Sequence, residues 1–536
     1  MLVSQGQSSP PTIAKQPAAV FAGVGQRATF TVTASGEGPF TYQWRSNNTA
    51  IAGATSSTFT LLNLQATYAA NYSVDVSNGV GTTPSSAVAL TIIPTTPGDL
   101  DLSFSPLPMG NNVSGFVMSG FVSAILQQPD GKILVAGSFN RVAGTPPPNP
   151  TGGTVCKNIV RFHADGSLDE SFSYDIGANA TINTMLLQPD GKILIGGQFT
   201  TYKGVGRSCL ARLNADGTLD TGFMATGAGF NDSVHALALQ PDGQILVGGN
   251  YFTFNSAARG RLVRLNAADG TLDTTFLNGL SGANNTIYSI VLDGSSIYVA
   301  GNFTTFNGTG RARIAKLQSN GMLDSGFNPD TGFTDGQVNS IALQPSGKIV
   351  AVGTFTAFRG NTVNHIVRIT SSGAFDYGFA GGLNNWPNSV VMQPDGKFIV
   401  SGGFTTVDSV ARGRIVRFLE DGTLDATFGT GAGAGSQVFT LALQPDGQLL
   451  AGGSFTTFNG QPRYLVARVF AATPAPSIAY FKNGSMLEIN WSGNFDLQHA
   501  DDLTPPVNWQ TVIGPSPASV PLNGTPKRFF RLIEKE

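Results

Sequence analysis

The chain has 536 residues and a formal net charge of -2, and only 12% of its residues are charged, against roughly 25% in ordinary soluble domains. The weak charge excludes binding to nucleic acid through general electrostatics, and the 41% hydrophobic content excludes a disordered chain. The two cysteines, Cys156 and Cys209, exclude a disulfide-rich scaffold and any multi-cysteine metal site.

The first residues, Met1–Gln7, lack the basic and apolar segments of a signal peptide. No apolar run reaches the length of about 18 residues that a membrane span needs, so no membrane span is expected. Sparse charge with many Gly, Ser, Thr and Asn residues is nevertheless typical of exported proteins. We therefore expect a secreted or cell-surface protein whose leader is not present in this chain.

Residues 10–95 alternate between apolar and polar side chains in four segments, 28–34, 40–46, 57–63 and 70–78. This alternation predicts a β-sandwich. The region resembles an immunoglobulin-like domain, because Trp44 and Tyr72 stand where such domains carry a core tryptophan and a corner tyrosine. Val32 and Val74 occupy the positions of the two bridging cysteines, so the resemblance implies the sandwich without its disulfide.

A phrase close to LQPDGKILVGG recurs seven times after this region. Its first apolar residue after the turn is found at Ile133, Ile193, Ile245, Ile297, Ile349, Phe398 and Leu449, a period of about 50 residues. The first interval is lengthened by a Pro-rich insertion at 146–153. A second phrase, as in LARLNADGTLDTGF at 210–223, lies between the copies and ends in Leu-Asp-x-x-Phe.

Each period therefore contains four strand-like segments, here called a, b, c and d, joined by Asp-Gly turns that favour hairpins. Four strands repeated at this period predict the blades of a β-propeller. The d segments are out of phase, because 98–104 precedes the first a segment and 464–470 lacks a following d segment. We predict an all-β, seven-bladed propeller over 98–471, closed by pairing of 98–104 with 464–470.

The recurring phrases QPDGKILVGG and ARLNADGSLDxxF together resemble the delta-sixty repeat family of bacterial β-propellers, whose function is uncertain. The resemblance covers the propeller region and implies the propeller fold without an activity. Residues 478–536 contain further strand-like segments and resemble the small C-terminal β-domains of secreted bacterial proteins. The predicted order is thus an immunoglobulin-like sandwich, a propeller and a small β-domain.

One basic residue and one aspartate recur once per blade, the aspartate eight or nine positions after the basic residue. A charge inside an apolar strand needs a partner, so we expect structural ion pairs. They are Arg161 with Asp169, Arg212 with Asp220, Arg264 with Asp273, Lys316 with Asp324, Arg368 with Asp376, Arg417 with Asp425 and, through ring closure, Arg468 with Asp101.

The sequence offers no catalytic constellation. The four histidines, His163, His235, His365 and His499, form no HxH or HxxxH pair and are read as isolated strand or surface residues. There is no GxSxG motif, and the Asp-Gly turns lack the alternating oxygen ligands of a calcium loop. We predict that the protein is not an enzyme and has no cofactor and no metal site. Whether Cys156 and Cys209 form a disulfide is left open.

The b–c connections are strongly basic, with twelve Lys or Arg residues against the single acid Asp408. Six of these arginines are candidate ligands for an acidic glycan: Arg207, Arg261, Arg313, Arg359, Arg414 and Arg463. The alternative is that they bond loop carbonyls of adjacent blades.

The leading hypothesis is a non-catalytic extracellular or cell-surface binding or adhesion protein, whose partners are other surface proteins or an acidic glycan. A structural subunit of a larger surface assembly and, third, a carbohydrate-active enzyme are the alternatives. The sequence sets neither the oligomeric state nor the ligand.

Overall fold

A computed structural model describes residues 9–23, 27–61, 64, 66–93, 97–104, 106, 109–110, 120–142, 154–172, 177–225, 227–379, 381–429 and 431–471, and six strands between 478 and 534. The chain divides into two compact units: residues 97–100 with 104–471, and residues 1–96 with 101–103 and 472–536. The regular structure of the described residues is β throughout, apart from one short 3-10 turn, η1 (Ala66–Tyr68). The Pro-rich insertion at 146–153 lies outside the described residues.

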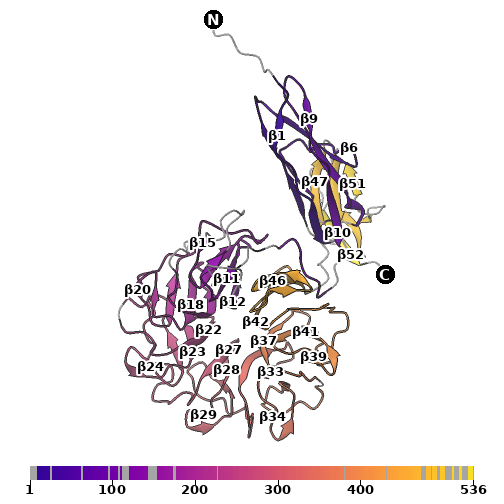
Figure 1. Ribbon diagram of the computed structural model, residues 1–536. Helices are drawn as coiled ribbons and strands as arrows, with labels where there is room; N and C mark the ends of the chain where they lie inside the picture. Colours follow the sequence, from indigo (N-terminus) through magenta and orange to yellow (C-terminus); the bar gives the residue numbers. More distant parts are fainter. Residues whose placement is uncertain are drawn as a thin grey trace. The chain divides into compact units, whose positions relative to one another are not determined.

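The first unit is a seven-bladed β-propeller (Figure 1). Each blade has a three-stranded antiparallel sheet formed by its a, b and c segments, in that order. The sheets are β12 (Phe121–Gln127), β13 (Ile133–Ser138) and β16 (Ile159–Phe162); β17 (Ile182–Leu187), β18 (Ile193–Gly197) and β21 (Leu210–Leu213); β22 (Val234–Leu239), β23 (Ile245–Gly249) and β26 (Leu262–Leu265); β27 (Ile287–Asp293), β28 (Ser296–Gly301) and β31 (Ile314–Leu317); β32 (Val338–Leu343), β33 (Ile349–Gly353) and β36 (Ile366–Ile369); β37 (Pro387–Met392), β38 (Phe398–Gly402) and β41 (Ile415–Phe418); and β42 (Val438–Leu443), β43 (Gln448–Gly453) and β46 (Val466–Phe470).

The Asp-Gly turns join a to b as predicted. In the first blade Gly131 adopts a φ of 84°, which glycine reaches without steric cost, and the Asp130 carboxylate accepts the backbone N–H of Lys132 at 3.1 Å. The b strand that follows is buried along both faces, as in β18 and β23, because each blade lies between two others. This explains why the b segments are continuously apolar.

The a strands form the inner edge of the ring, and each contacts the a strands of the two adjacent blades. The ring closes between the last blade and the first, where β42 contacts β12. The segment preceding the first blade completes the closure, since Leu100 pairs with Val469. Gly98 N–H donates to the Phe470 carbonyl at 2.6 Å, and Phe470 N–H donates to the Asp99 carbonyl at 2.9 Å. The segment around Leu100 therefore lies beside the c strand of the last blade, as the offset between the repeats predicts.

The fourth segment of each blade is shorter than predicted. Instead of a strand, d contributes a single antiparallel bridge to c, such as Phe162 with Leu168. The reason is the aspartate that follows: the Asp169 carboxylate accepts the backbone N–H of Ser171 at 3.0 Å and its hydroxyl at 2.6 Å. This local turn competes with the strand ladder and directs Phe172 into the core, where it is 1% exposed.

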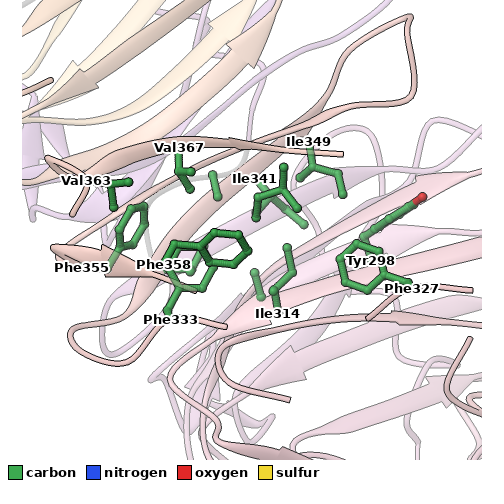
Figure 2. Close-up of a cluster of buried hydrophobic side chains, with 14 residues drawn as sticks. Tyr298, Ile314, Phe327, Phe333, Ile341, Ile349, Phe355, Phe358, Val363 and Val367 are labelled. Carbon is green, nitrogen blue, oxygen red and sulfur yellow. The ribbon is translucent and has the colours of Figure 1, made fainter. Parts of the chain in front are cut away.

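The core is divided among the interfaces between blades. Figure 2 shows one of these clusters, in which Tyr298 and Ile314 of the fourth blade pack with residues of the fifth. Phe333 lies 4.4 Å from Phe355 and 4.7 Å from Phe358, measured between ring centroids. Each blade is thus stabilised by its neighbours as well as by its own strands.

The N-terminal region of the second unit is an immunoglobulin-like sandwich. One sheet has the order β2 (Val20–Gly23), β10 (Val88–Ile93), β8 (Ala70–Ser77), β5 (Thr41–Ser46) and β6 (Thr49–Ala50), and β3 (Ala28–Thr31) pairs with β7 (Thr58–Leu61) in another. Trp44 is fully buried. The Tyr72 hydroxyl donates to the Tyr68 carbonyl at 3.0 Å, as in a tyrosine corner. Val32 and Val74 are buried in the same core.

The C-terminal region has two three-stranded sheets. One has the order β47 (Ile478–Asn483), β48 (Met486–Trp491), β51 (Ala518–Pro521), and the other β50 (Gln510–Thr511), β49 (Phe495–Ala500), β52 (Phe529–Glu534). No helix within the described part of the chain has the length and apolar character needed to cross a membrane.

Candidate functional site

Direct contacts between side chains are found in the predicted ion pairs of the first six blades. The distances between the basic nitrogen and the carboxylate Oδ2 are 2.7 Å for Arg161–Asp169, 2.8 Å for Arg212–Asp220, 2.7 Å for Arg264–Asp273, 3.1 Å for Lys316–Asp324, 2.6 Å for Arg368–Asp376 and 2.8 Å for Arg417–Asp425. For the predicted seventh pair, Asp101 is fully buried and Arg468 is 7% exposed. The Arg468 guanidinium lies 4.9 Å above the Phe104 ring, and the other arginines of the series lie above equivalent phenylalanines.

These arginines also join adjacent blades. Arg161 donates to the Ala215 carbonyl of the second blade at 2.5 Å, and Arg264 donates to the Ser319 carbonyl of the fourth at 2.6 Å. Arg468 in the last blade donates to the Ala164 carbonyl of the first at 2.7 Å. These arginines therefore bind each of their blades to the next, which accounts for a basic residue recurring at this position of the repeat.

The aspartates of these pairs are held in the charged form. Burial alone would raise the pKa of Asp169, but hydrogen bonds from Ser171 and the charge of Arg161 outweigh it and hold the pKa well below its usual value. The pKa of Asp425 is lowered against its burial by the hydrogen bonds from Thr427 and by Arg417. A site built for proton transfer near neutral pH needs the opposite shift.

The basic residues of the b–c connections are here called the rim. The six of them that were predicted to bind an acidic glycan do not occupy equivalent positions. Arg207 and Arg463 follow the b–c hairpins, and each donates to the carbonyl of the preceding residue, as do Arg259, Arg311 and Arg412. Arg261, Arg313 and Arg414 lie two residues further on, with positive φ. Arg359 lies at a hairpin turn, 3.5 Å from the Asp330 carboxylate. The side chain of Arg141, another basic residue of these connections, lies outside the described residues.

Several rim guanidiniums are engaged by loops leading to the next blade. Arg313 donates to the Phe333 carbonyl and Arg414 donates to the Ala434 carbonyl at 2.6 Å. Burial lowers the pKa of Arg313, and the nearby charge of Asp335 opposes this effect. These contacts agree with the alternative interpretation in which the arginines bond loop carbonyls.

A different group of side chains gathers at the inner edge of the ring, at the end where the a strands begin. Every a strand has a bulge near its start, where two residues oppose one residue of the b strand. Bulges redirect side chains and are frequent next to functional sites. The bulged residues, here called the bulge ring, are Ser123, Asn183, His235, Tyr288, Asn339, Asn388 and Phe439.

The members of the bulge ring link one blade to the next. Amide or hydroxyl donors reach the first a-strand carbonyl of the following blade from Ser123 at 2.6 Å, Asn183 at 3.0 Å, Asn339 at 2.8 Å and Asn388 at 3.1 Å. The His235 ring packs against the Tyr288 ring at 5.2 Å. All seven residues are partly exposed, so the ring is held in place and still open to a ligand.

The bulge ring contains no Asp, Glu, Lys or Arg. Its one histidine, His235, lies on an a strand, 3.3 Å from the Asn183 amide and 3.1 Å from the Ser233 hydroxyl. Burial lowers the pKa of His235, and the charge of Asp232 opposes this only in part, so the ring is neutral at pH 7. Such a surface suits polar, uncharged ligands.

Sequence reasoning missed the bulge ring, although it carries a sequence signal. In five of the seven a segments, the bulged position is a polar or histidine side chain directly after an apolar residue, as in Val-His-Ala-Leu at 234–237. The bulge itself interrupts the expected alternation by one residue, which the sequence does not reveal. Within the described residues, no group of three or more His, Cys, Asp or Glu side chains could hold a metal ion.

Cys156 and Cys209 are buried and are not bonded to each other. Burial raises the pKa of the Cys156 thiol to about 12 and that of Cys209 to about 11. Since the thiolate is the reactive form, neither thiol should react with Ellman's reagent at pH 8 in the folded protein, and two should react in urea. Rapid reaction of either thiol without urea would contradict this burial.

The repeats of the propeller match the family model described as "Domain of unknown function (DUF5122) beta-propeller". The matched residues are 128–172, 188–223, 240–276, 295–327, 344–379, 393–428 and 444–471. No curated protein matches the chain.

Three solved structures are each similar to a part of this chain. The N-terminal Ig1-2 module of the Drosophila receptor protein tyrosine phosphatase DLAR is 21% identical, with a TM-score of 0.15, and the match covers 17% of this chain and 49% of that one. The complex of titin M10 with the obscurin-like 1 Ig domain is 22% identical, with 16% and 97% covered and a TM-score of 0.15. The twitchin kinase fragment of C. elegans is 18% identical, with 16% and 21% covered and a TM-score of 0.15. The chain spans about half the length of the first of these. By its seven repeats, the central region of the chain is similar to a β-propeller family of unknown function.

Proposed function

We propose that the chain is a non-catalytic binding protein, secreted or displayed at a cell surface, whose propeller presents the bulge ring to a ligand. The observation that carries this proposal is the gathering of one bulged, partly exposed side chain from every blade at one end of the ring. A binding site needs polar groups fixed in place by a rigid scaffold, and the hydrogen bonds between blades fix these groups. We further propose that the repeats are of the delta-sixty type.

The composition of the bulge ring supports binding rather than catalysis. General acid–base chemistry needs titratable groups placed around a reacting atom, whereas the ring offers mainly amides, a hydroxyl and aromatic rings. Its neutrality also favours an uncharged ligand over the acidic glycan that the rim arginines suggested. The experiment must therefore compare the binding of neutral glycans with the binding of acidic glycans.

The test is a glycan array, with neutral and acidic members, probed with the full chain at two salt concentrations. A ring variant, Asn183→Ala with Asn339→Ala, should weaken binding at least about tenfold. A rim variant of two partly exposed arginines, Arg311→Ala with Arg412→Ala, should change it less than about twofold. Both variants must keep the wild-type urea midpoint.

Salt provides the second readout of this experiment. Binding of a neutral ligand by the bulge ring should be insensitive to salt, because neither the ligand nor the side chains of the ring carry a charge. Binding that weakens with salt and is lost in the rim variant, with the ring variant unaffected, would contradict the proposal and place the site on the rim.

A further inference from the structure

One blade differs from the other six at the end where the bulge ring lies. The residue two positions before the bulged one is Trp386 in the sixth blade, and 54% of its surface is exposed. The equivalent residues are smaller or polar in five blades, namely Thr181, Ser233, Thr286, Gln337 and Gln437, and the remaining one is Phe121. Tryptophan is enriched at interaction sites because its ring combines a large apolar surface with a polar N–H group.

The sixth blade also lacks a side chain beside this tryptophan. Gly403 N–H donates to the Trp386 carbonyl at 2.8 Å. The six equivalent positions all carry side chains: Ser138, Gln198, Asn250, Asn302, Thr354 and Ser454. A Cβ placed on Gly403 would lie 3.2 Å from Nε2 of Gln437, in the seventh blade. The absence of a side chain at Gly403 thus lets the Gln437 amide pack against the strand end that is hydrogen-bonded to Trp386.

The neighbouring blades supply further groups to this place. Asn388, in the bulge ring, donates one amide N–H to the Val438 carbonyl at 3.1 Å, and a carboxamide has further donor and acceptor capacity. Phe439 of the seventh blade packs edge-on against Phe121 of the first, with 5.5 Å between ring centroids. Three consecutive blades, the sixth, seventh and first, therefore each contribute an aromatic side chain: Trp386, Phe439 and Phe121. The amides of Asn388 and Gln437 lie in the same blades, and none of these residues is charged.

We infer that the surface formed by Trp386, Asn388, Gly403 and Gln437, here called the blade-6 subsite, binds a neutral sugar residue of a glycan; this inference rests on the proposed function. A pyranose ring has one face of C–H groups and an edge of hydroxyls. The C–H face stacks on the indole of Trp386, and the hydroxyls exchange hydrogen bonds with the amide of Asn388 and with the amide of Gln437, which packs against Gly403. An anionic sugar would need a cation at this place, and these positions contain none.

Two variants of the full chain test the subsite independently. Trp386→Ala removes the stacking face, and Gly403→Ser introduces the side chain that the first and seventh blades carry at this position. Each should weaken binding to neutral glycans on the array at least about tenfold. The matched control is Phe252→Ala, since Phe252 is 55% exposed on the b–c connection of the third blade, outside the bulge ring, and it should leave binding unchanged.

The outcomes separate this inference from the proposed function. Glycan binding that is lost in the ring variant Asn183→Ala/Asn339→Ala but unchanged in Trp386→Ala and Gly403→Ser overturns the subsite and leaves the proposed function standing. Binding to proline-rich peptides in place of glycans, lost in Trp386→Ala, overturns the sugar class and again leaves the ring as the site. Binding only to acidic glycans, lost in the rim variant, overturns both, and the absence of binding to any neutral glycan overturns the sugar proposal.

Discussion

Replacing Arg417 by methionine should lower the free energy of unfolding of the propeller by about 3–5 kcal/mol. The Arg417 and Asp425 side chains are each 4% exposed and pair at 2.8 Å. The guanidinium also lies 4.9 Å above the Phe428 ring and donates to the Ala471 carbonyl of the seventh blade. The substitution removes the direct partner of the buried Asp425 carboxylate and leaves Lys397, whose Nζ lies 3.9 Å away, as its remaining countercharge; this accounts for most of the expected loss. Urea denaturation of the full chain, followed by circular dichroism, measures it.

The matched control replaces the equivalent basic residue of the fourth blade, Lys316, by methionine. Lys316 and Asp324 form the equivalent pair at 3.1 Å, but their side chains are 20% and 27% exposed. Because water screens this pair, Lys316→Met should cost no more than about 1 kcal/mol. Equal losses in the two variants would show that burial does not set the contribution of these pairs.

Replacing Gly98 by alanine should destabilise the closure of the ring by about 2–4 kcal/mol. Gly98 has a φ of 101°, a conformation that alanine adopts only with strain. An added Cβ would also lie 2.2 Å from the carbonyl oxygen of Gly429, so the backbone must move. The urea midpoint should fall, and limited proteolysis should cut near residues 97–104 earlier than in the wild type.

Gly204→Ala is the control that measures backbone strain without a steric clash. Gly204 has a φ of 77° in an exposed hairpin, and nothing lies within 4 Å of an added Cβ. This variant should lose about 1 kcal/mol and keep the wild-type proteolysis pattern. If Gly98→Ala behaved in the same way, the segment containing Gly98 would contribute little to holding the ring closed.

Much of the propeller can be predicted from the sequence because its determinants are local. The Asp-Gly turns specify hairpins wherever they occur, and the distance between copies specifies the blade. The offset between the first d segment and the last c segment places Leu100 beside Val469. The ion pairs are predictable as well, because Arg417 and its equivalents stand within otherwise apolar strands and need a countercharge.

The missed features depend on contacts between segments that lie far apart in the sequence. Asn179 holds the b–c hairpin of its blade by accepting the backbone N–H groups of Thr200 and Thr201. Asn231, Asn284, Asp335 and Asn384 do the same in later blades. These residues recur at about the blade period, at intervals of 49 to 53 residues, but the sequence alone does not show which groups they contact. The bulge ring escapes for the same reason, since a bulge is a property of pairing rather than of one strand.

The closing contact has a consequence for the order of synthesis. Gly98 and Leu100 leave the ribosome before any blade, and their partners Val469 and Phe470 leave it after all seven. Until then the segment that contains Gly98 and Leu100 has an unpaired strand edge, and the first blade exposes to the solvent the face that packs against the seventh. Such edges recruit other strands, so translation that stalls within the sixth or seventh blade should yield aggregation-prone fragments.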